Sequence, residues 1–545
     1  MKRKIASLLC LLVAANVLMA VDVKPTKNVI VMIPDGTSLS VLSASRWLKT
    51  YRNEGTTLNV DPYMSGTVTT FSSNAPIGDS APTTSCFMTG VPQQAGNVSI
   101  YPVADPANDL VKLNPDSAYQ PLVTILEAMQ REQAKSAGLV VTCEFPHATP
   151  ADCAAHTYNR SDYKVIAPQM AYNNLEVMFG GGNAFVTEDM KQHFKNNGTT
   201  LIQNDKQALL DFKGDKAWAL FGDKELPYDL DRDTTAVPSL AQMTAKAIDV
   251  LQQNKKGFFL MVEGSKVDWA AHANDPTAMM TEFLAFDKAV GVAMEFARRN
   301  GNTTVIVLPD HGNSGFSIGR SNLKKSYTRM TLEDLFGAVS RYKHTAEGLE
   351  KILMNTQPEN IKSVFQQYTG IELSEDEVQL LLRSKNYKAE NYMEVAKSEN
   401  MTHYITNFMN ARTAFGFTTG GHTGEEVFLA SYHPKGDVLK GNVRNTEVNN
   451  YLFKAAGLKK SLKQTTAEIY AKHTDVFATM NCTIDAPKDS IPQLTVKNAG
   501  NTLVVRAYSS VATLNGKSFD LGSVAVYVDK TNTFYLPKML ADKLK

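Results

Sequence analysis

The sequence has little cysteine. Its 545 residues include only five cysteines, and one of them, Cys10, lies in an apolar run at the N-terminus. The four others are too few for a disulfide framework in a chain of this length. Cys143 and Cys153 are close enough in sequence to pair in an oxidising compartment, and two buried free thiols are an equally good alternative.

The chain also has no excess of charge of either sign. With 56 basic and 55 acidic residues its formal net charge is +1. General nucleic-acid binding requires a basic surface, so we expect no stable nucleic-acid binding. Overall charge does not steer anions either, so attraction of an anionic substrate must come from local groups.

Long apolar runs are absent except at the N-terminus. There, three basic residues precede an apolar run from about Ile5 to Val21. The run is short for a membrane span, and no basic stop signal follows it. We therefore predict a signal peptide over residues 1–20, with an uncleaved anchor as the alternative. A periplasmic or secreted protein without a transmembrane segment is then expected.

Several short apolar runs end in polar residues. Runs of this kind, rich in Val, Ile, Leu and Phe, are typical of strands buried on both faces of a parallel sheet. Amphipathic stretches between them, such as 239–254 and 278–301, are typical of helices. The alternation predicts an α/β fold, a central mostly parallel sheet flanked by helices on both faces. In such sheets ligands bind beyond the carboxyl ends of the strands. The four apolar runs are 28–36, 138–150, 257–268 and 303–312.

Two regions depart from this alternation. Residues 320–412 have a helical pattern with caps at Thr331 and Ser374, which predicts a mostly helical insertion. From about residue 490 short alternating runs predict a small β-rich C-terminal extension, 490–545, with late edge strands of the main sheet as the alternative. The catalytic domain is then expected to span 21–489.

Two pairs of residues have the spacing of metal ligands. Asp268 and His272 are four residues apart, so on a helix they share one face, which suits two ligands of one zinc ion. A surface polar pair is the alternative. Asp310 and His311 are adjacent and would point to opposite faces of a continuing strand. Where Gly312 turns the chain both can converge on one ion, and a loop with a buried histidine is the alternative.

The segment FPHATPAD, residues 145–152, combines two signals. Thr149 is expected as a helix N-cap, with Pro150 at the first helical position. His147 and Thr149 are two residues apart and can face the same side. Arg160, about three helical turns past the cap, is expected to reach back over the site. Its guanidinium suits a bidentate contact with phosphate, and a surface charge is the alternative.

Further polar residues lie at the ends of other runs. Glu263 ends a buried run, where a carboxylate is costly unless it is paired or binds metal. His422 lies in a glycine-rich turn, and Asp35 follows the first strand-like run. Ser80, with Pro82 just after it, is expected at the start of a helix, as a cap or as a nucleophile. Together these residues indicate one metal-dependent site.

In this order the motifs resemble those of the alkaline phosphatase family. The resemblance runs from about residue 28 to 435, interrupted by 320–412. It implies hydrolysis of phosphate monoesters with broad specificity, through a phosphoserine on Ser80, and two zinc ions with a third metal, usually magnesium. The matching residues are Asp35-Gly36, Asp79-Ser80-Ala81, His147-Ala148-Thr149-Pro150, Arg160, Glu263-Gly264, Asp268, His272, Asp310-His311 and His422.

The resemblance also implies a role for each residue. Arg160 is expected to bind the substrate phosphate. From its place beside Ser80, Asp79 is expected to orient neighbouring groups, with Arg160 as one option, rather than to bind metal. His147 stands beside the third ion, whose identity is open because some family members carry an aspartate there. The ligands are, for the first zinc, Asp268, His272 and His422; for the second, Asp35, Asp310 and His311 with Ser80; and for the third ion, Asp35, Thr149 and Glu263.

Other functions are weighed against this one. A phosphodiesterase or sulfatase of the same superfamily is the alternative within catalysis, and Ser80 and Arg160, with Thr149 and Glu263, favour monoesters. A noncatalytic phosphate- or metal-binding protein is the alternative outside catalysis. The sequence leaves the physiological substrate and the oligomeric state open, with a homodimer as one option.

Overall fold

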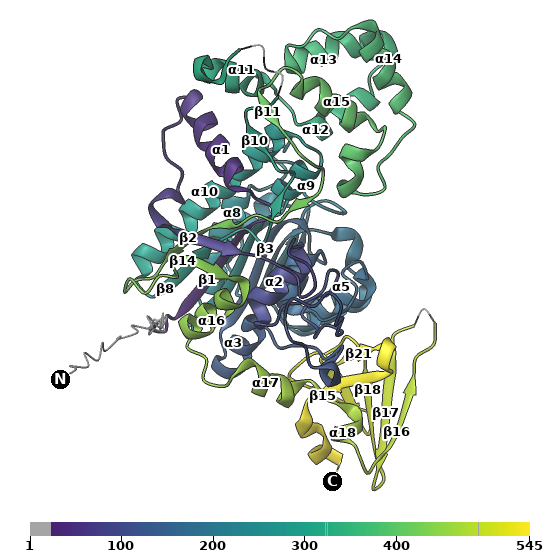
Figure 1. Ribbon diagram of the computed structural model, residues 1–545. Coiled ribbons are helices and arrows are strands. Elements are labelled where there is room, and N and C mark those ends of the chain that lie inside the picture. Colours follow the sequence, from purple (N-terminus) through teal and green to yellow (C-terminus); the bar gives the residue numbers. More distant parts are fainter. Residues whose placement is uncertain (1–22, 322, 324, 489, 545) are drawn as a thin grey trace, which may run out of the picture.

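A ten-stranded sheet runs through the centre of the protein (Figure 1). The computed structural model describes residues 23–321, 323, 325–488 and 490–544. The expected signal peptide, residues 1–20, lies outside the described residues. The strands lie in the order β14-β2-β13-β8-β1-β7-β3-β4-β6-β5.

Seven neighbouring strands of this sheet are parallel. At the other end, β13 runs antiparallel to both β8 and β2, and β14 is parallel to β2. The predicted mostly parallel sheet is thus confirmed. The strands are β1 (Asn28–Pro34), β2 (Met64–Thr69), β3 (Ser136–Glu144), β4 (Val177–Gly181), β5 (Thr200–Gln203), β6 (Ala217–Leu220), β7 (Phe258–Gly264), β8 (Thr303–Val307), β13 (Val427–Tyr432) and β14 (Gly441–Arg444).

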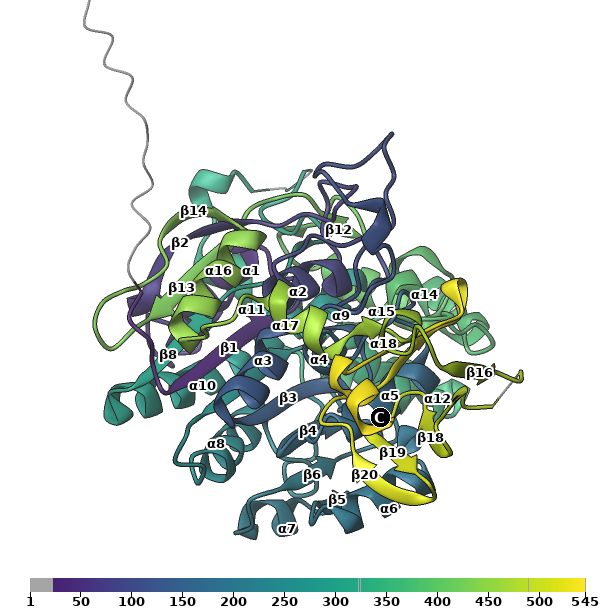
Figure 2. The ribbon, with the colours of Figure 1, turned by 90° about the horizontal axis from the view of Figure 1, so that it is seen from below.

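The sheet separates two hydrophobic cores. Along β1, Val29 and Val31 belong to one core and Ile30 and Met32 to the other, because successive strand side chains point to opposite faces. One core is completed by α2 (Ser80–Thr89), α3 (Ile125–Gln133), α4 (Ala148–Ala154), α5 (Tyr163–Tyr172), α6 (Glu188–Asn196) and α16 (Asn445–Ala456). The other is completed by α1 (Leu39–Tyr51), α7 (Lys206–Asp211), α8 (Leu240–Leu251), α9 (Lys266–His272) and α10 (Pro276–Asn300), and Figure 2 shows both layers from below.

The helix ends follow local chemistry. Ser239 forms a capping box at the start of α8, and the Asp275 carboxylate accepts hydrogen bonds from two N–H groups at the start of α10. α10 ends at Gly301, whose left-handed φ of 64° suits glycine. The two amphipathic stretches are therefore helices, as predicted.

Among the described residues between 320 and 412, five α-helices make up most of the segment, at the top of Figure 1. They enclose a hydrophobic core of their own, and Thr331 and Ser374 form the predicted capping boxes. Two short antiparallel ladders tie the ends of the segment together, β9 (Gly312–Asn313) with β12 (His422–Thr423) and β10 (Ser317–Ile318) with β11 (Phe415–Gly416). The helices are α11 (Leu332–Arg341), α12 (Ala346–Met354), α13 (Ile361–Thr369), α14 (Glu375–Ser384) and α15 (Met401–Asn410).

The C-terminal part forms two small antiparallel sheets with a separate core. Among the described residues neither sheet pairs with the ten-stranded sheet, so these are not its late edge strands. The sheets begin before residue 490, the boundary expected from the sequence, because β15 and β16 pair with later strands. The strands are β15 (Ala471–Lys472), β16 (Asn481–Asp485), β17 (Gln493–Asn498), β18 (Asn501–Arg506), β19 (Val511–Leu514), β20 (Lys517–Asp520), β21 (Val526–Val528) and β22 (Thr533–Leu536).

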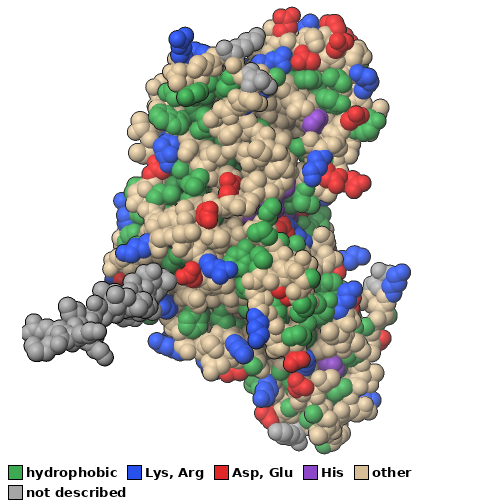
Figure 3. All heavy atoms as spheres, in the orientation of Figure 1, with side chains coloured by type: hydrophobic (Ala, Val, Ile, Leu, Met, Phe, Trp, Pro, Cys, Tyr) green, Lys and Arg blue, Asp and Glu red, His purple; other side chains and the backbone are tan. Residues whose placement is uncertain are grey.

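Three further features bear on the sequence analysis. Cys143 and Cys153 are buried free thiols, so the alternative of a disulfide between them is not realised. Within the described ranges, the helices lack the combination of length and hydropathy needed to cross a membrane. On the face seen in Figure 3, basic and acidic side chains are interspersed.

Candidate functional site

The site lies where the parallel strands end. Asp35 directly follows β1, Glu263 is the penultimate residue of β7, and the pair Asp310–His311 follows β8. His147 lies just past β3. Because the carboxyl ends of parallel strands meet at one edge of a sheet, residues far apart in sequence come together there.

Ser80 is the first residue of α2, and its neighbour Asp79 is the N-cap. The Ser80 side chain is almost fully buried. Its hydroxyl lies 3.2 Å from Nε2 of His311 and 3.3 and 3.4 Å from the two carboxylate oxygens of Asp35. The free N–H groups at a helix N-terminus favour a bound phosphate, so the start of this ten-residue helix is suited to one.

The side chains of Asp310 and His311 lie close together. His311 Nε2 lies 3.3 Å from Asp35 and 3.5 Å from Asp310. Strand alternation does not separate the pair because β8 already ends at Val307. On its other side, His311 places Nδ1 3.1 Å from the carbonyl oxygen of Gly312.

Burial and crowded charge dominate the electrostatics here. Burial raises the pKa of Asp35 well above its usual range, and the nearby carboxylates of Asp310 and Asp268 add to this. Burial alone would lower the pKa of His311, but the carboxylates of Asp310, Asp35 and Asp268 raise it well above its usual range. The cluster thus holds more negative charge than its protein partners neutralise, which suits a bound cation.

Asp268 and His272 lie on one face of α9, and His422 joins them from β12. His272 Nε2 is 3.4 Å from the Asp268 carboxylate and 3.1 Å from His422 Nε2. The Nδ1 atoms lie 2.8 Å from the carbonyl oxygen of Gly420 and 2.9 Å from that of Gly78. A carbonyl only accepts, so each Nδ1 carries the proton and each Nε2 presents a lone pair. Two lone pairs that face each other need a cation between them.

A third group of polar atoms has no hydrogen-bond partner among the residues that the structure describes. Its members are the buried atoms Glu263 Oε1, Thr149 Oγ1 and, beside them, His147 Nδ1. Burial raises the pKa of Glu263 to about 8, and the Asp310 carboxylate adds to the rise. Buried polar atoms are nearly always satisfied, so the two orphaned oxygens of Glu263 and Thr149 fit a further ion. Cys143, which the sequence indicated only as a possible disulfide partner or buried thiol and not as a site residue, donates from its thiol to Glu263 at 3.5 Å.

The imidazole, thiol and carboxylate atoms of the site form several groups that could hold a metal ion. Within the part of the chain that the structure describes, four groups bring ligand atoms within 4.8 Å of one another. Two of the groups share Asp268, and two share His311. The groups are Asp35, Asp268 and His311; Asp268, His272 and His422; Asp79, His311 and His422; and Cys143, His147 and Glu263.

Thr149 is not the N-cap that the sequence predicted. The cap is His147, and Thr149 is the second residue of α4. Pro150 is accommodated in the first turn because the first N–H groups of a helix have no intrahelical acceptor. The Thr149 hydroxyl is therefore not used for capping.

Arg160 reaches the site by a different route from the one predicted. α4 ends at Ala154, so Arg160 is held on a loop rather than three helical turns along the helix, and its N–H donates to the Gly96 carbonyl at 2.8 Å. Its guanidinium bonds the Asp79 carboxylate at 2.6 Å. Burial would raise the pKa of Asp79, but Arg160 holds it well below its usual range.

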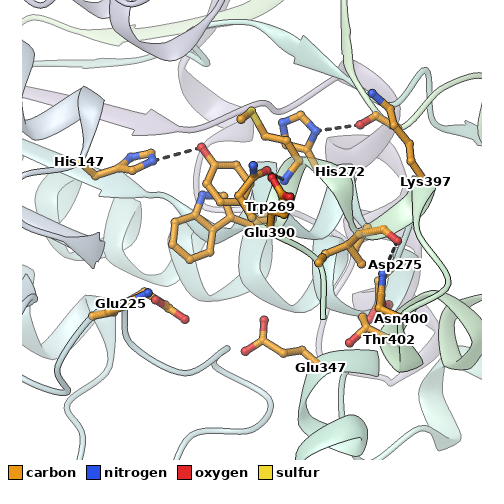
Figure 4. Close-up of a pocket in the computed structure, with 18 of the residues that line it drawn as sticks. His147, Glu225, Trp269, His272, Asp275, Glu347, Glu390, Lys397, Asn400 and Thr402 are labelled. Atoms are coloured by element: carbon orange, nitrogen blue, oxygen red, sulfur yellow. Dashed lines mark hydrogen bonds between the residues drawn. The ribbon is translucent and has the colours of Figure 1, made fainter. Parts of the chain in front are cut away.

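One wall of the site comes from the helical segment 320–412. Trp269, labelled in Figure 4, stacks against Tyr392 of that segment with ring centroids 4.6 Å apart. These residues line a cavity of about 920 Å³ that also contains Arg160, His272 and His422. Tyr392 carries no local signal in the sequence, because long-range packing alone brings it to the site.

The fold and the site define a metal-dependent enzyme built on a central, mostly parallel sheet. A family model of alkaline phosphatases matches residues 26–458. Alkaline phosphatase 4 of Bacillus subtilis is 33% identical over 450 residues, which are 79% of this chain and 89% of that protein. Alkaline phosphatase 3 of the same organism is 32% identical over 445 residues, 79% of this chain and 88% of that protein.

Solved structures of alkaline phosphatases have a similar fold. The cold-active alkaline phosphatase of a Shewanella species has a TM-score of 0.66 and 26% identity, covering 79% of this chain and all of that one (100%). The Thermus thermophilus alkaline phosphatase shares the fold, with a TM-score of 0.69 and 24% identity over 80% of this chain and 93% of that one. This chain belongs to the alkaline phosphatase family and is a phosphoric monoester hydrolase.

Proposed function

We propose that the enzyme hydrolyses phosphate monoesters of broad specificity through a phosphoserine on Ser80, with two zinc ions and one magnesium ion. The observation that carries this proposal is the pair of lone pairs on His272 and His422, 3.1 Å apart beside Asp268. Nitrogen and carboxylate ligands in this number are those that zinc prefers.

Each metal site has a set of residues that would hold it. Zinc supplies positive charge that makes a serine hydroxyl or a water more acidic and stabilises leaving oxygens. Magnesium prefers oxygen ligands, and the third set is made of oxygen atoms only. The sets are Asp268, His272 and His422; Asp35, Asp310 and His311 with Ser80; and Asp35, Thr149 and Glu263.

The protein's own residues account for binding and nucleophilic attack. Arg160 binds two nonbridging oxygens of the phosphoryl group, and the N-terminus of α2 faces the same charge. Ser80 Oγ forms a bond to phosphorus as the bond to the alcohol oxygen breaks. Water then hydrolyses the phosphoserine and releases inorganic phosphate. Since these contacts are to phosphate, the alcohol contributes little to recognition.

The cellular setting is proposed on the sequence alone. Basic residues followed by a short apolar run support export and removal of residues 1–20. We propose a periplasmic or secreted enzyme with residues 21–489 as its catalytic part and the segment 320–412 as an insertion in it. A homodimer is the oligomeric state to test first.

A comparison of ester types tests the proposed reaction. We expect p-nitrophenyl phosphate to be hydrolysed with a much higher kcat/KM than bis-p-nitrophenyl phosphate or p-nitrophenyl sulfate. The reason is that Arg160 and the start of α2 together suit a dianion with free equatorial oxygens. A preference for the diester or the sulfate would refute the monoesterase assignment in favour of a related hydrolase.

The R160K variant tests how phosphate is held. Lysine keeps the charge but lacks the planar fork, so KM and the inhibition constant of inorganic phosphate should both rise roughly tenfold to a hundredfold. Steady-state kinetics with added phosphate measure both. The matched control is R341K, at an exposed arginine paired with Glu333 on α11. Equal phosphate inhibition in R160K and R341K would show that Arg160 does not bind the substrate.

A further inference from the structure

Tyr392 brings the helical segment 320–412 into direct contact with residues beside the phosphate site. It lies in a short 3-10 helix, Tyr392–Lys397, between α14 and α15. Its hydroxyl is 3.2 Å from Nε2 of His147, and its ring stacks on Trp269 at an interplanar angle of 14°. In Figure 4 a dashed line from the His147 ring marks this hydrogen bond, and Trp269 lies close to it.

His147 Nε2 has two neighbours. Besides the Tyr392 hydroxyl, it faces Nη2 of Arg160 at 3.5 Å. A guanidinium only donates, so Nε2 accepts and the His147 proton resides on Nδ1. Tyr392 must then donate as well. One nitrogen lone pair therefore faces two donors, the Tyr392 hydroxyl at the shorter distance and the Arg160 guanidinium at the longer one.

This arrangement has a consequence for phosphate. The Arg160 guanidinium is already held at one end by Asp79, at 2.6 Å, so Nη2 is the end that His147 and a bound phosphate compete for. A hydrogen bond from Tyr392 satisfies the lone pair of His147 and leaves Nη2 available. Without it, Arg160 becomes the remaining donor that His147 contacts.

We propose that Tyr392 is a positioning residue: its hydroxyl occupies His147 Nε2 and thereby frees Arg160 for phosphate. The inference rests on the proposed role of Arg160 in binding substrate. It gives the segment 320–412 a function in the reaction, because this segment supplies the Tyr392 hydroxyl.

The Y392F variant removes this hydroxyl and keeps the ring that stacks on Trp269. The matched control is Y387F, the same change at a tyrosine of the same segment that is 54% exposed. We expect Y392F to raise both KM and the dissociation constant of inorganic phosphate about threefold to tenfold, as loss of one hydrogen bond does. kcat should change little. Calorimetric titration of the metal-loaded enzymes with phosphate measures binding without turnover, and thermal unfolding checks the fold.

A double-mutant cycle separates this role from packing. In an H147A background there is no lone pair to compete for Arg160, so Y392F should cause no further loss of phosphate affinity. An equal loss in both backgrounds would overturn the proposal and assign Tyr392 a packing role. Phosphate affinity of Y392F equal to that of Y387F and wild type would also overturn it, with the phosphatase assignment intact. A wild-type enzyme that neither binds phosphate nor hydrolyses monoesters would instead refute the proposed function, and this inference with it.

Discussion

Replacing Ser80 by alanine is expected to lower kcat for phosphate monoesters by roughly a thousandfold or more, the size of effect seen when a nucleophile is removed. Alanine is an excellent helix former, so α2 keeps its first residue. The hydroxyl that faces Asp35 and His311 is lost, and with it the atom that would be phosphorylated.

The measurement pairs turnover with metal content. S80A should retain bound zinc close to the wild-type amount, because the nitrogen and carboxylate ligands are unchanged, and acid quenching should trap no phosphoserine. T84V is the control one turn further along α2, where the buried Thr84 hydroxyl has no hydrogen-bond partner in the described part of the chain. Wild-type turnover in S80A would rule out Ser80 as the nucleophile.

Chelation of the metals is expected to abolish activity and to make stability depend on pH. Asp35, Asp268 and His311 have ligand atoms within 4.8 Å of one another, and Asp35, Asp268 and Glu263 are fully or almost fully buried carboxylates. A cation offsets their mutual repulsion and their desolvation. Once it is removed, protons are the remaining source of positive charge.

The direction of the pH effect follows from the pKa shifts. Burial raises the pKa of Glu263 to about 8 and that of Asp35 well above its usual range, and nearby carboxylates raise that of His311. The folded metal-free protein therefore holds protons that the unfolded chain has already released between about pH 6.5 and 8. Its free energy of unfolding should fall as pH rises through that window, by on the order of 2 kcal/mol per proton. Below pH 6.5 the lowered pKa values of His147 and His422, caused first by burial, act in the opposite direction.

Thermal unfolding of EDTA-treated and metal-loaded enzyme at pH 6.5 and 8 checks this. The treated protein should lose stability between the two pH values by more than the loaded one, and zinc with magnesium should restore activity. Equal pH dependence in both forms would show that the carboxylate cluster is not compensated by metal. Full activity after exhaustive chelation would exclude a metal-dependent reaction.

The sequence predicts which residues form this site better than it predicts which helices, strands and loops position them. Asp268 and His272 were predictable because the helical period is a local property. The strand ends at Asp35 and Glu263 were predictable because fully buried parallel strands read as short apolar runs. Each of these predictions depends on a few neighbouring residues.

The features that the sequence predicted wrongly or did not predict depend on more than a few neighbouring residues. Arg160 lies on a loop because α4 already ends at Ala154, and the thirteen-residue step from His147 to Arg160 does not indicate where the helix ends. The cap fell on His147 instead of Thr149 because extended backbone at the cap, and not a side-chain bond, begins this helix. Cys143 and Tyr392 meet site residues 120 and 245 positions away in sequence, which no local pattern encodes.

The paired strands at the base of the helical segment bear on how such an enzyme can diversify. β9 with β12, and β10 with β11, clamp the chain on both sides of the segment, immediately beside His311 and at His422. The two strand pairs therefore hold His311 and His422 in place whatever the length of the segment between them. Because closing a longer loop costs only logarithmically more entropy, this segment can lengthen, shorten or be replaced while the metal ligands keep their positions. Because this segment contributes Tyr392 to the cavity that also contains Arg160, a different segment would change the cavity wall without any change in the ligands.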